Sequence, residues 1–201
     1  MSPAQPRHQV PDARSWEYAD GFVAPSPALQ EAREAARADQ WEVLSNGTTA
    51  LLAFLTRTMQ ASSVVTIGTD AGVSALALLE GMSDHGVLTS IDPDAERQAA
   101  ARKVLSLARI RSNQVRLITG TPLDVLPKLR DGAYDMVLIN GDRLEYVEYV
   151  SQALRLLRTG GIVVVNDALA NNHVADPDNE DDDTLIIRET LDSVLETEEF
   201  T

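Results

Sequence analysis

Two glycines and a later aspartate have the types and spacing of a nucleoside-binding site. Gly68 and Gly72 follow the apolar run 64–67, and Asp92 follows a second apolar run, 87–91. Glycine is needed where the backbone takes a positive φ or where a ligand lies against it. An acidic residue at the tip of the second strand can accept hydrogen bonds from both hydroxyls of a ribose. The spacing therefore indicates a cofactor that contains a nucleoside.

The glycine pattern distinguishes two classes of cofactor. A dinucleotide site carries the pattern G-x-G-x-x-G, but Asp70 and Val73 stand at its second and third glycine positions. This mismatch disfavours a nicotinamide-dependent dehydrogenase, and the Asp70 carboxylate would also repel a pyrophosphate. S-adenosylmethionine carries no phosphate and fits the turn better. The alternative without a cofactor is a glycine turn that serves only the architecture of another α/β protein.

Alternating strands and helices must position these residues. Five apolar strands are predicted, over 63–67, 87–91, 115–119, 134–139 and 162–165. Helices are predicted between and after them, over 94–107, 123–129, 144–157 and 184–198. This rhythm predicts an α/β fold, a doubly wound and mostly parallel sheet with helices on both faces. Ligands of such sheets bind at the carboxyl ends of the strands. Polar and glycine residues follow the predicted strands at that edge: Gly68, Asp92, Gly120, Thr121, Asn140, Asn166 and Asp167.

Residues 12–60 are expected to form helices that cover the sheet or a partner subunit. A short helix is predicted over 12–22, and a second begins at Ser26-Pro27, with serine as the N-cap, and runs to Gln40. A third is predicted over 48–59, after a break at Asn46-Gly47. Its apolar stripe is expected to comprise Leu51, Leu52, Phe54 and Leu55. Residues 1–11 are expected to be a flexible arm, and 12–201 a single domain whose α/β core spans 63–201.

Composition narrows the classes of function. The formal net charge of −14 disfavours a nucleic-acid binder, whose phosphate contacts need clustered lysine and arginine. The chain has no cysteine, which excludes disulfides and thiolate metal sites. No apolar run approaches the length of a membrane span and no signal peptide is visible, so a cytoplasmic location without a membrane partner is expected.

From about Asp12 onward the sequence resembles the cation-dependent O-methyltransferases, a class I S-adenosylmethionine family that includes the catechol and caffeoyl-CoA enzymes and small bacterial members. The resemblance rests on four segments: 65–74, 91–94, 135–146 and 156–167. It implies a Rossmann-like methyltransferase fold and a homodimer. It also implies methyl transfer from S-adenosylmethionine to a small hydroxylated acceptor, for example a catechol.

The resemblance also implies which residues contact the cofactor. By position these are Leu44, Gly68, Thr69, Gly72, Ser74, Asp92, Pro93, Thr121, Pro122 and Asn140. The glycine turn and Ser74 would hold the methionine end, Asp92 the ribose, and Thr121 with Pro122 the adenine. Leu44, with the nearby Ser45 and Thr49, matches a segment that contacts both cofactor and substrate.

A metal site and a catalytic set follow from the same resemblance. Asn140, Asn166 and Asp167 match the ligands of Mg²⁺ or another divalent cation, and the catalytic residues would be Asn140, Arg143 and Asp167. Three departures weaken this site. Asn140 stands where the family has a carboxylate, Asn166-Asp167 reverses the usual Asp-Asn order, and Arg143 replaces a lysine and stays protonated. Mg²⁺ prefers carboxylates, so its affinity is expected to fall unless Asp142 compensates. The alternative is that Asn140 and Asn166 only cap strand ends.

Other departures leave alternatives open. Thr66 replaces an acid that is usual in the first motif, and the family continues into an antiparallel hairpin that the 201 residues do not include. Without a metal another base is needed, and His173 is a candidate, although a lone loop histidine is more often a surface residue. The acidic segment 171–183 is expected to be a solvated loop, with a lid over the pocket as the alternative. A second function stays open, that of an S-adenosylmethionine-binding protein that has lost catalysis and acts as a sensor or partner.

Overall fold

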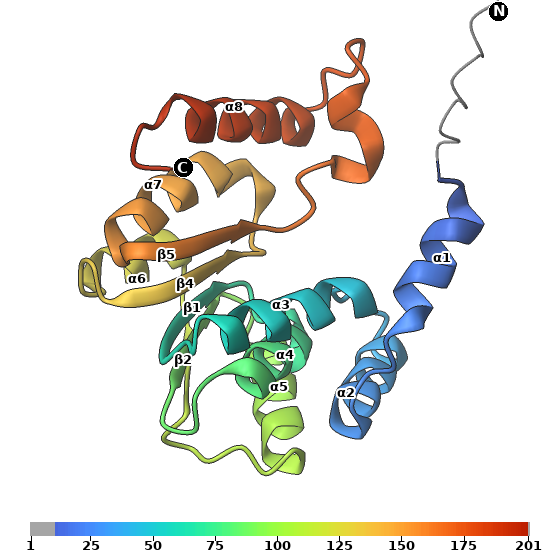
Figure 1. The fold of residues 1–201 in the computed structure, drawn as a ribbon, viewed down its shortest axis with the longest axis vertical. Helices are drawn as coiled ribbons and strands as arrows, with labels where there is room; N and C mark the ends of the chain where they lie inside the picture. The colour runs from blue at the N-terminus through green and yellow to red at the C-terminus, as the bar shows by residue number, and fades with distance from the viewer. Residues whose placement is uncertain (1–10, 201) are drawn as a thin grey trace, which may run out of the picture.

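Five parallel strands form the centre of the computed structural model, which describes residues 11–200 (Figure 1). In chain order they are β1 (Ser63–Ile67), β2 (Val87–Asp92), β3 (Val115–Thr119), β4 (Tyr134–Ile139) and β5 (Leu157–Val165). Their order in the sheet is β3-β2-β1-β4-β5. The order reverses between β1 and β4, which is where ligands bind in such folds. The predicted doubly wound parallel sheet is confirmed.

Helices cover both faces of this sheet. They are α1 (Ala13–Phe22), α2 (Pro27–Ala38), α3 (Asn46–Thr58), α4 (Val73–Gly81), α5 (Ala95–Leu107), α6 (Pro122–Val125), α7 (Tyr146–Leu156) and α8 (Asp182–Glu196). Short 3-10 turns lie at Asp70–Gly72, Leu126–Lys128, Arg143–Glu145 and Ala170–Ala175. None of the helices within residues 11–200 is long and apolar enough to cross a membrane.

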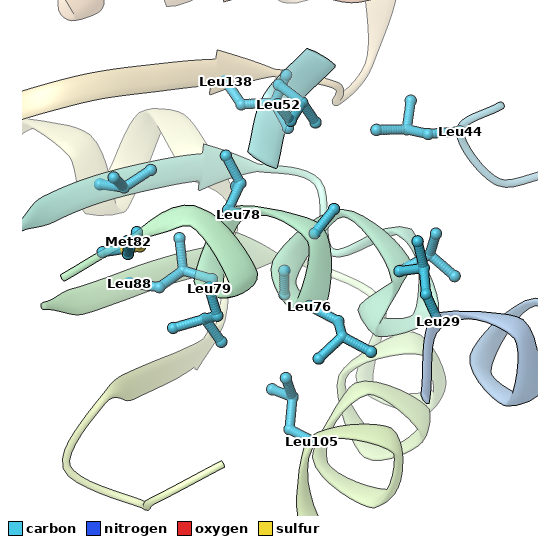
Figure 2. Close-up of a cluster of buried hydrophobic side chains, with 14 of the residues drawn as sticks. Leu29, Leu44, Leu52, Leu76, Leu78, Leu79, Met82, Leu88, Leu105 and Leu138 are labelled. Carbon is cyan, nitrogen blue, oxygen red and sulfur yellow. The ribbon is translucent and has the colours of Figure 1, made fainter. Parts of the chain in front are cut away.

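Side chains of each strand alternate between two buried clusters because successive residues of a strand point to opposite faces. On one face, Leu138 of β4 packs with Leu52 of α3 and Leu78 of α4, as Figure 2 shows. On the other face, Ile139 of β4 packs with side chains of α7 and α8, among them Tyr149. The central strands β1 and β4 are therefore buried on both faces of the sheet.

The N-terminal helices are present, with one difference at the start of α3. Asp12 and Ser26 cap α1 and α2, since their side chains accept hydrogen bonds from the backbone of the first turn. The predicted break at Asn46-Gly47 is wrong because the hydroxyl of Ser45 accepts the N–H of Thr48 at 3.2 Å. Ser45 thus acts as the N-cap, and Asn46-Gly47 forms the first turn of α3.

The predicted apolar stripe of α3 is only partly buried. Leu52 is fully buried and Leu55 is half-buried, whereas Leu51 and Phe54 are exposed. The helix packs mainly on α4, and Leu51 and Phe54 lie outside this contact. The expected arm, residues 1–11, lies outside the described residues except for Pro11.

The last strand begins earlier than the sequence predicts. The sequence predicts a helix to 157 and a strand over 162–165, but residues 158–161 also belong to β5. The pairing of β4 with β5 shifts register between Tyr134 and Met136, and this irregularity accommodates Gly160 at a φ of +76°. Arg158 also binds the carboxylate of Asp135 at 2.7 Å, which holds the early part of the strand in place.

The turn after β1 is packed too closely for any residue but glycine at its first position. Gly68 has a φ of +90°, and a methyl group on it would lie 2.7 Å from the carbonyl carbon of Asn140 and overlap the oxygen. The hydroxyl of Thr66 donates to the carbonyl of Gly68 at 2.9 Å. Thr66 therefore braces the turn at the position where the resembled family has an acid.

A buried carboxylate follows in the same turn. Asp70 is 5% exposed, has a φ of +51° and accepts the N–H of Leu44 at 3.3 Å. Burial raises the pKa of Asp70 to about 7, although hydrogen bonds from the backbone of Leu44 and Ser74 act in the opposite direction. Asp70 thus links the segment before α3 to the start of α4. Its burial destabilises the ionised carboxylate relative to the protonated form.

We expect Gly68→Ala to cost about 3 kcal/mol or more of unfolding free energy, because the new methyl group overlaps the backbone of Asn140. Urea denaturation measures this. Gly21→Ala is the matched control, since nothing lies within 4 Å of a methyl group added in α1. The control should change stability by less than about 1 kcal/mol. Equal effects of the two substitutions would contradict the packing described for the turn.

We expect Asp70→Asn to stabilise the ligand-free protein, and to do so more at pH 8 than at pH 5. The pKa of Asp70 rises from its ordinary value of 3.8 to about 7 on folding. The wild-type fold therefore loses stability as the pH rises from about 4 to about 7, and the loss then levels off. Asparagine avoids this loss, so the gain should be on the order of 2–4 kcal/mol at pH 8 and about 1 kcal/mol at pH 5. Denaturation at the two pH values measures it, and a gain independent of pH would show that Asp70 ionises normally.

Candidate active site

A cleft of about 910 Å³ opens at the carboxyl edge of the sheet. It lies over the ends of β1, β4 and β5, at the point where the strand order reverses. Its lining comprises Glu42, Val43, Leu44, Ser45, Thr48, Asp70, Arg97, Asn140, Gly141, Asp142, Arg143, Tyr146, Asn166, Asp167, Ala168, Leu169, Asn171 and Asp183. Most of these side chains are polar, and both charge signs are represented.

Backbone pairing continues past the strand ends and sets the floor of the cleft. The N–H of Asn140 donates to the carbonyl of Ile67 at 2.8 Å, and the N–H of Asn166 donates to that of Ile139 at 2.9 Å. The two asparagines therefore lie side by side, and the Asn166 amide donates to the Asn140 side-chain oxygen at 2.8 Å. The structure therefore brings together two residues that were predicted as metal ligands, but their side chains bond to each other.

Arg143 forms an ion cluster with two carboxylates on the wall of the cleft. It begins a 3-10 turn that Asp142 caps by accepting the N–H of Leu144 at 3.1 Å. Its guanidinium pairs with Asp167, which follows β5, and with Asp183 of α8 at 3.1 Å. Because a guanidinium stays protonated, this is a permanent positive charge held between two negative ones.

The residues proposed for Mg²⁺ do not suit that ion. Within residues 11–200 no group of three or more acidic, histidine or cysteine side chains is placed to hold a metal. The one carboxylate of the predicted set, Asp167, is paired with Arg143, and the amides of Asn140 and Asn166 are bonded to each other. Mg²⁺ needs charged oxygens in octahedral geometry and gives up its water reluctantly. We therefore derive no catalytic step through a metal.

Left-handed backbone is concentrated around the cleft. Asp167, Asn171 and Asn172 have φ values of +53°, +54° and +73°. Non-glycine residues adopt this conformation rarely, at a cost of about 1–3 kcal/mol each, and such residues cluster at binding sites. The loop after β5 is thus bent over the strand ends, which brings the carboxylate of Asp167 to Arg143.

The acidic segment 171–183 is anchored to α8. The guanidinium of Arg188 donates to the carbonyls of Val174, Asn179 and His173 at 3.2, 2.9 and 3.2 Å. Most of its side chains are exposed, as expected, but its backbone is held by these bonds. Asn171 is the residue of this segment, apart from Asp183, that lines the cleft.

The residues predicted to hold the methionine end lie behind the cleft floor. Thr69 and Ser74 are fully buried, and the Ser74 hydroxyl donates to the carbonyl of Thr69 at 3.4 Å. Gly72, at a φ of +96°, is the N-cap residue of α4 and packs against the backbone of Ala101 in α5. Of all the residues predicted to contact the cofactor, Leu44 and Asn140 are the two that line the cleft itself.

Asp92 lies next to the turn after β1. One of its carboxylate oxygens accepts the N–H of Thr69 at 2.8 Å, and the other accepts the N–H of Asp94 at 2.8 Å. Each carboxylate oxygen can accept a second hydrogen bond, so both retain capacity for a ligand. Asp92 therefore ties the turn after β1 to the end of β2 at this edge.

The predicted adenine residues lie outside the main cleft. Thr121 is exposed just before α6, Pro122 is buried as its first residue, and Pro93 is exposed beside Asp92. All three follow β2 or β3, on the other side of β1 from Asn140 and Asp167. The predicted cofactor residues thus form a row along the sheet edge that extends beyond the cleft.

Tyr146, Tyr149 and His173 are poor candidates for the base that removes a proton from a ligand in the cleft. Burial raises the pKa of Tyr146 to about 12, and its hydroxyl donates to the carbonyl of Asn166 at 3.2 Å. Burial and the neighbouring Glu145 raise the pKa of Tyr149 further. His173 is exposed, lies 3.8 Å from Asp181 and does not line the cleft.

Sequence reasoning missed Asp183 and Arg97. Asp183 lies 40 positions after Arg143, inside an acidic run that gives no sign of which carboxylate faces the cleft. Arg97 lines the cleft from α5, where the sequence reads as an ordinary charged helix. Only the tertiary fold identifies these two residues.

Sequence comparison identifies the family. A family model described as O-methyltransferase matches residues 22–199. A protein of Mycobacterium tuberculosis named a probable O-methyltransferase is 37% identical over 186 residues, which cover 92% of this chain and 83% of that protein. A protein of Mycobacterium leprae named a putative O-methyltransferase is 37% identical over 184 residues, which cover 92% of this chain and 82% of that protein.

Solved structures agree with the sequence comparison. A Corynebacterium glutamicum protein superposes with a TM-score of 0.85 at 29% identity, covering 93% of this chain and 89% of that one. The O-methyltransferase TomG from Streptomyces achromogenes, involved in tomaymycin synthesis and solved with S-adenosylmethionine, gives a TM-score of 0.80 at 28% identity, covering 90% and 82%. The chain belongs to the O-methyltransferase family, the S-adenosylmethionine-dependent enzymes that its sequence resembles.

Proposed function

We propose that the chain transfers the methyl group of S-adenosylmethionine to a hydroxyl of a small acceptor bound in the cleft. The observation that supports this most is the position of the cleft. A polar space of about 910 Å³ lies at the switch point of the sheet, directly beside the turn at Gly68. This volume is suited to a small acceptor beside one end of a cofactor.

The cofactor is assigned to the row of residues along the sheet edge. Gly68, Thr69, Gly72 and Ser74 would hold the methionine end. Asp92, beside Pro93, would accept the ribose hydroxyls through its free lone pairs. Thr121 and Pro122 would flank the adenine, and Leu44 and Asn140 would lie where cofactor and acceptor meet.

When bound, S-adenosylmethionine supplies a methyl group on a sulfonium that an in-line nucleophile displaces. The chain's own residues orient the acceptor and exclude water, which lowers the entropy cost of the reaction. Leu44 and Leu169 supply apolar contact on two sides of the cleft, and Asn140 a polar floor. The carboxylate of Asp142, which also lines the cleft, would accept the proton of the acceptor hydroxyl.

The acceptor we propose is small and hydroxylated, with a catechol as the first candidate. The polar lining suits a ligand with more than one hydroxyl. A cytoplasmic location belongs to the same proposal. The second candidate function is a cofactor-binding sensor without catalysis, which the altered residues Asn140, Arg143 and Asn166 favour. Turnover separates the two functions.

We also propose that the protein is a homodimer formed through α1 and α3. These two helices contact each other, and α1 has no buried residue in the single chain. Trp16 is 67% and Phe22 74% exposed on α1, and Phe54 is 63% exposed on α3. Tyr18 of α1 is 73% exposed, and its ring centroid lies 6.1 Å from that of Phe22. Exposed aromatic side chains of this size are typical of a protein interface.

We expect S-adenosylhomocysteine to bind and NADH not to bind, as measured by calorimetric titration. Asp92→Asn should weaken the binding about 10- to 100-fold, because it removes a charged acceptor at the predicted ribose position. Asp192→Asn, an exposed position on α8, is the control and should bind as the wild type does. Circular dichroism verifies that each variant is folded. Absence of binding by the folded wild type would refute the cofactor assignment.

We expect the double substitution Trp16→Ser and Phe22→Ser to convert the dimer to a monomer at micromolar concentration. Sedimentation velocity of the two proteins measures the change. The control is Leu195→Ser, because Leu195 is also largely exposed but lies on α8. A monomeric wild type, or a double variant that remains dimeric, would contradict the proposed interface.

A further inference from the structure

The cleft contains a positive charge that belongs to the chain itself. The guanidinium of Arg143 is held from two sides, by Asp167 after β5 and by Asp183 of α8. All three side chains are partly exposed to the cleft and line it. Three separate elements therefore converge on one cation at the wall of the acceptor space.

Two of the three carboxylates that line the cleft near this cation, Asp167 and Asp183, are already paired with it; the third is Asp142. Asp167 is the one carboxylate of the predicted metal set, and its partner in the structure is Arg143. The two amides of that set, on Asn140 and Asn166, bond to each other, so in either orientation one amide oxygen is occupied. A metal that used the Asp167 carboxylate would have to displace Arg143 from it.

We propose that Arg143, clamped by Asp167 and Asp183, replaces a divalent cation in this cleft, so that the acceptor is recognised without a metal. The inference rests on the proposed function, because it takes the cleft to be the acceptor site. The guanidinium has five N–H donors, and two of its nitrogens bond to the carboxylates. Donors remain for an acceptor oxygen, and a fixed guanidinium stabilises an anionic oxygen as a charge-assisted partner. Arg143 is a positioning group and an electrostatic partner, not a base, because it does not lose its proton.

Removal of the Arg143 cation should increase the affinity of the cleft for a divalent ion. Arg143→Ala leaves Asp167 and Asp183 unpaired beside the two asparagines, so the variant should gain affinity for a divalent ion. We expect Mn²⁺, followed by electron paramagnetic resonance, to bind the wild type too weakly for a site to be resolved at 1 mM. We expect Arg143→Ala to bind it at least tenfold more tightly. Arg14→Ala is the matched control, because it frees Asp12 from a surface ion pair without affecting the cleft.

Titration of the wild type and of Arg143→Ala with S-adenosylhomocysteine accompanies the metal measurement. The wild type should bind this ligand equally with Mg²⁺ and with EDTA. Stoichiometric Mn²⁺ binding by the wild type would overturn the inference, and so would a folded Arg143→Ala variant with no gain. The wild-type measurement stands alone if Arg143→Ala does not fold. Failure of the proposed function is recognised separately, since it appears as absent nucleoside binding whatever the metal result.

Discussion

The contact between the backbones at Gly68 and Asn140 is the constraint on which the candidate site depends. It is possible only because position 68 has no side chain, and it brings the ends of β1 and β4 together at the reversal of strand order. Thr66 braces this turn from below, and Asp92 ties it to the neighbouring strand. The cleft lies on top of this junction, so its polar floor is determined by backbone geometry.

Charge is distributed unevenly around this junction. The chain as a whole is strongly acidic, yet the carboxylates at the cleft differ in burial and in ion pairing. Asp70 is buried and its pKa is raised to about 7, whereas Asp167 and Asp183 share the guanidinium of Arg143. An internal cation thus pairs with Asp167, the one carboxylate of the metal set that the family resemblance implies. The guanidinium is thus held in the wall of the cleft by two carboxylates of the chain itself.

Much of this architecture could be predicted from the sequence, because strand hydrophobicity and glycine spacing are local signals. The strands, the cap at Ser26 and the turn at Gly68 follow from neighbouring residues. The early start of β5 could not be predicted, since it depends on the ion pair between Arg158 and Asp135. The role of Asp183 depends in the same way on a contact across 40 positions. The hydrogen bond between the side chains of Asn140 and Asn166 could not be predicted either, because the sequence does not show whether two neighbouring amides bond to each other or to a ligand.

The most direct measurement of the central claim is transfer of a labelled methyl group from S-adenosylmethionine to a panel of catechols, with EDTA present throughout. The cleft geometry and its internal cation predict methylated product from at least one catechol, at a rate unchanged when Mg²⁺ replaces EDTA. A protein that binds the cofactor but methylates none of the panel, or that requires Mg²⁺ for every turnover, would contradict the account.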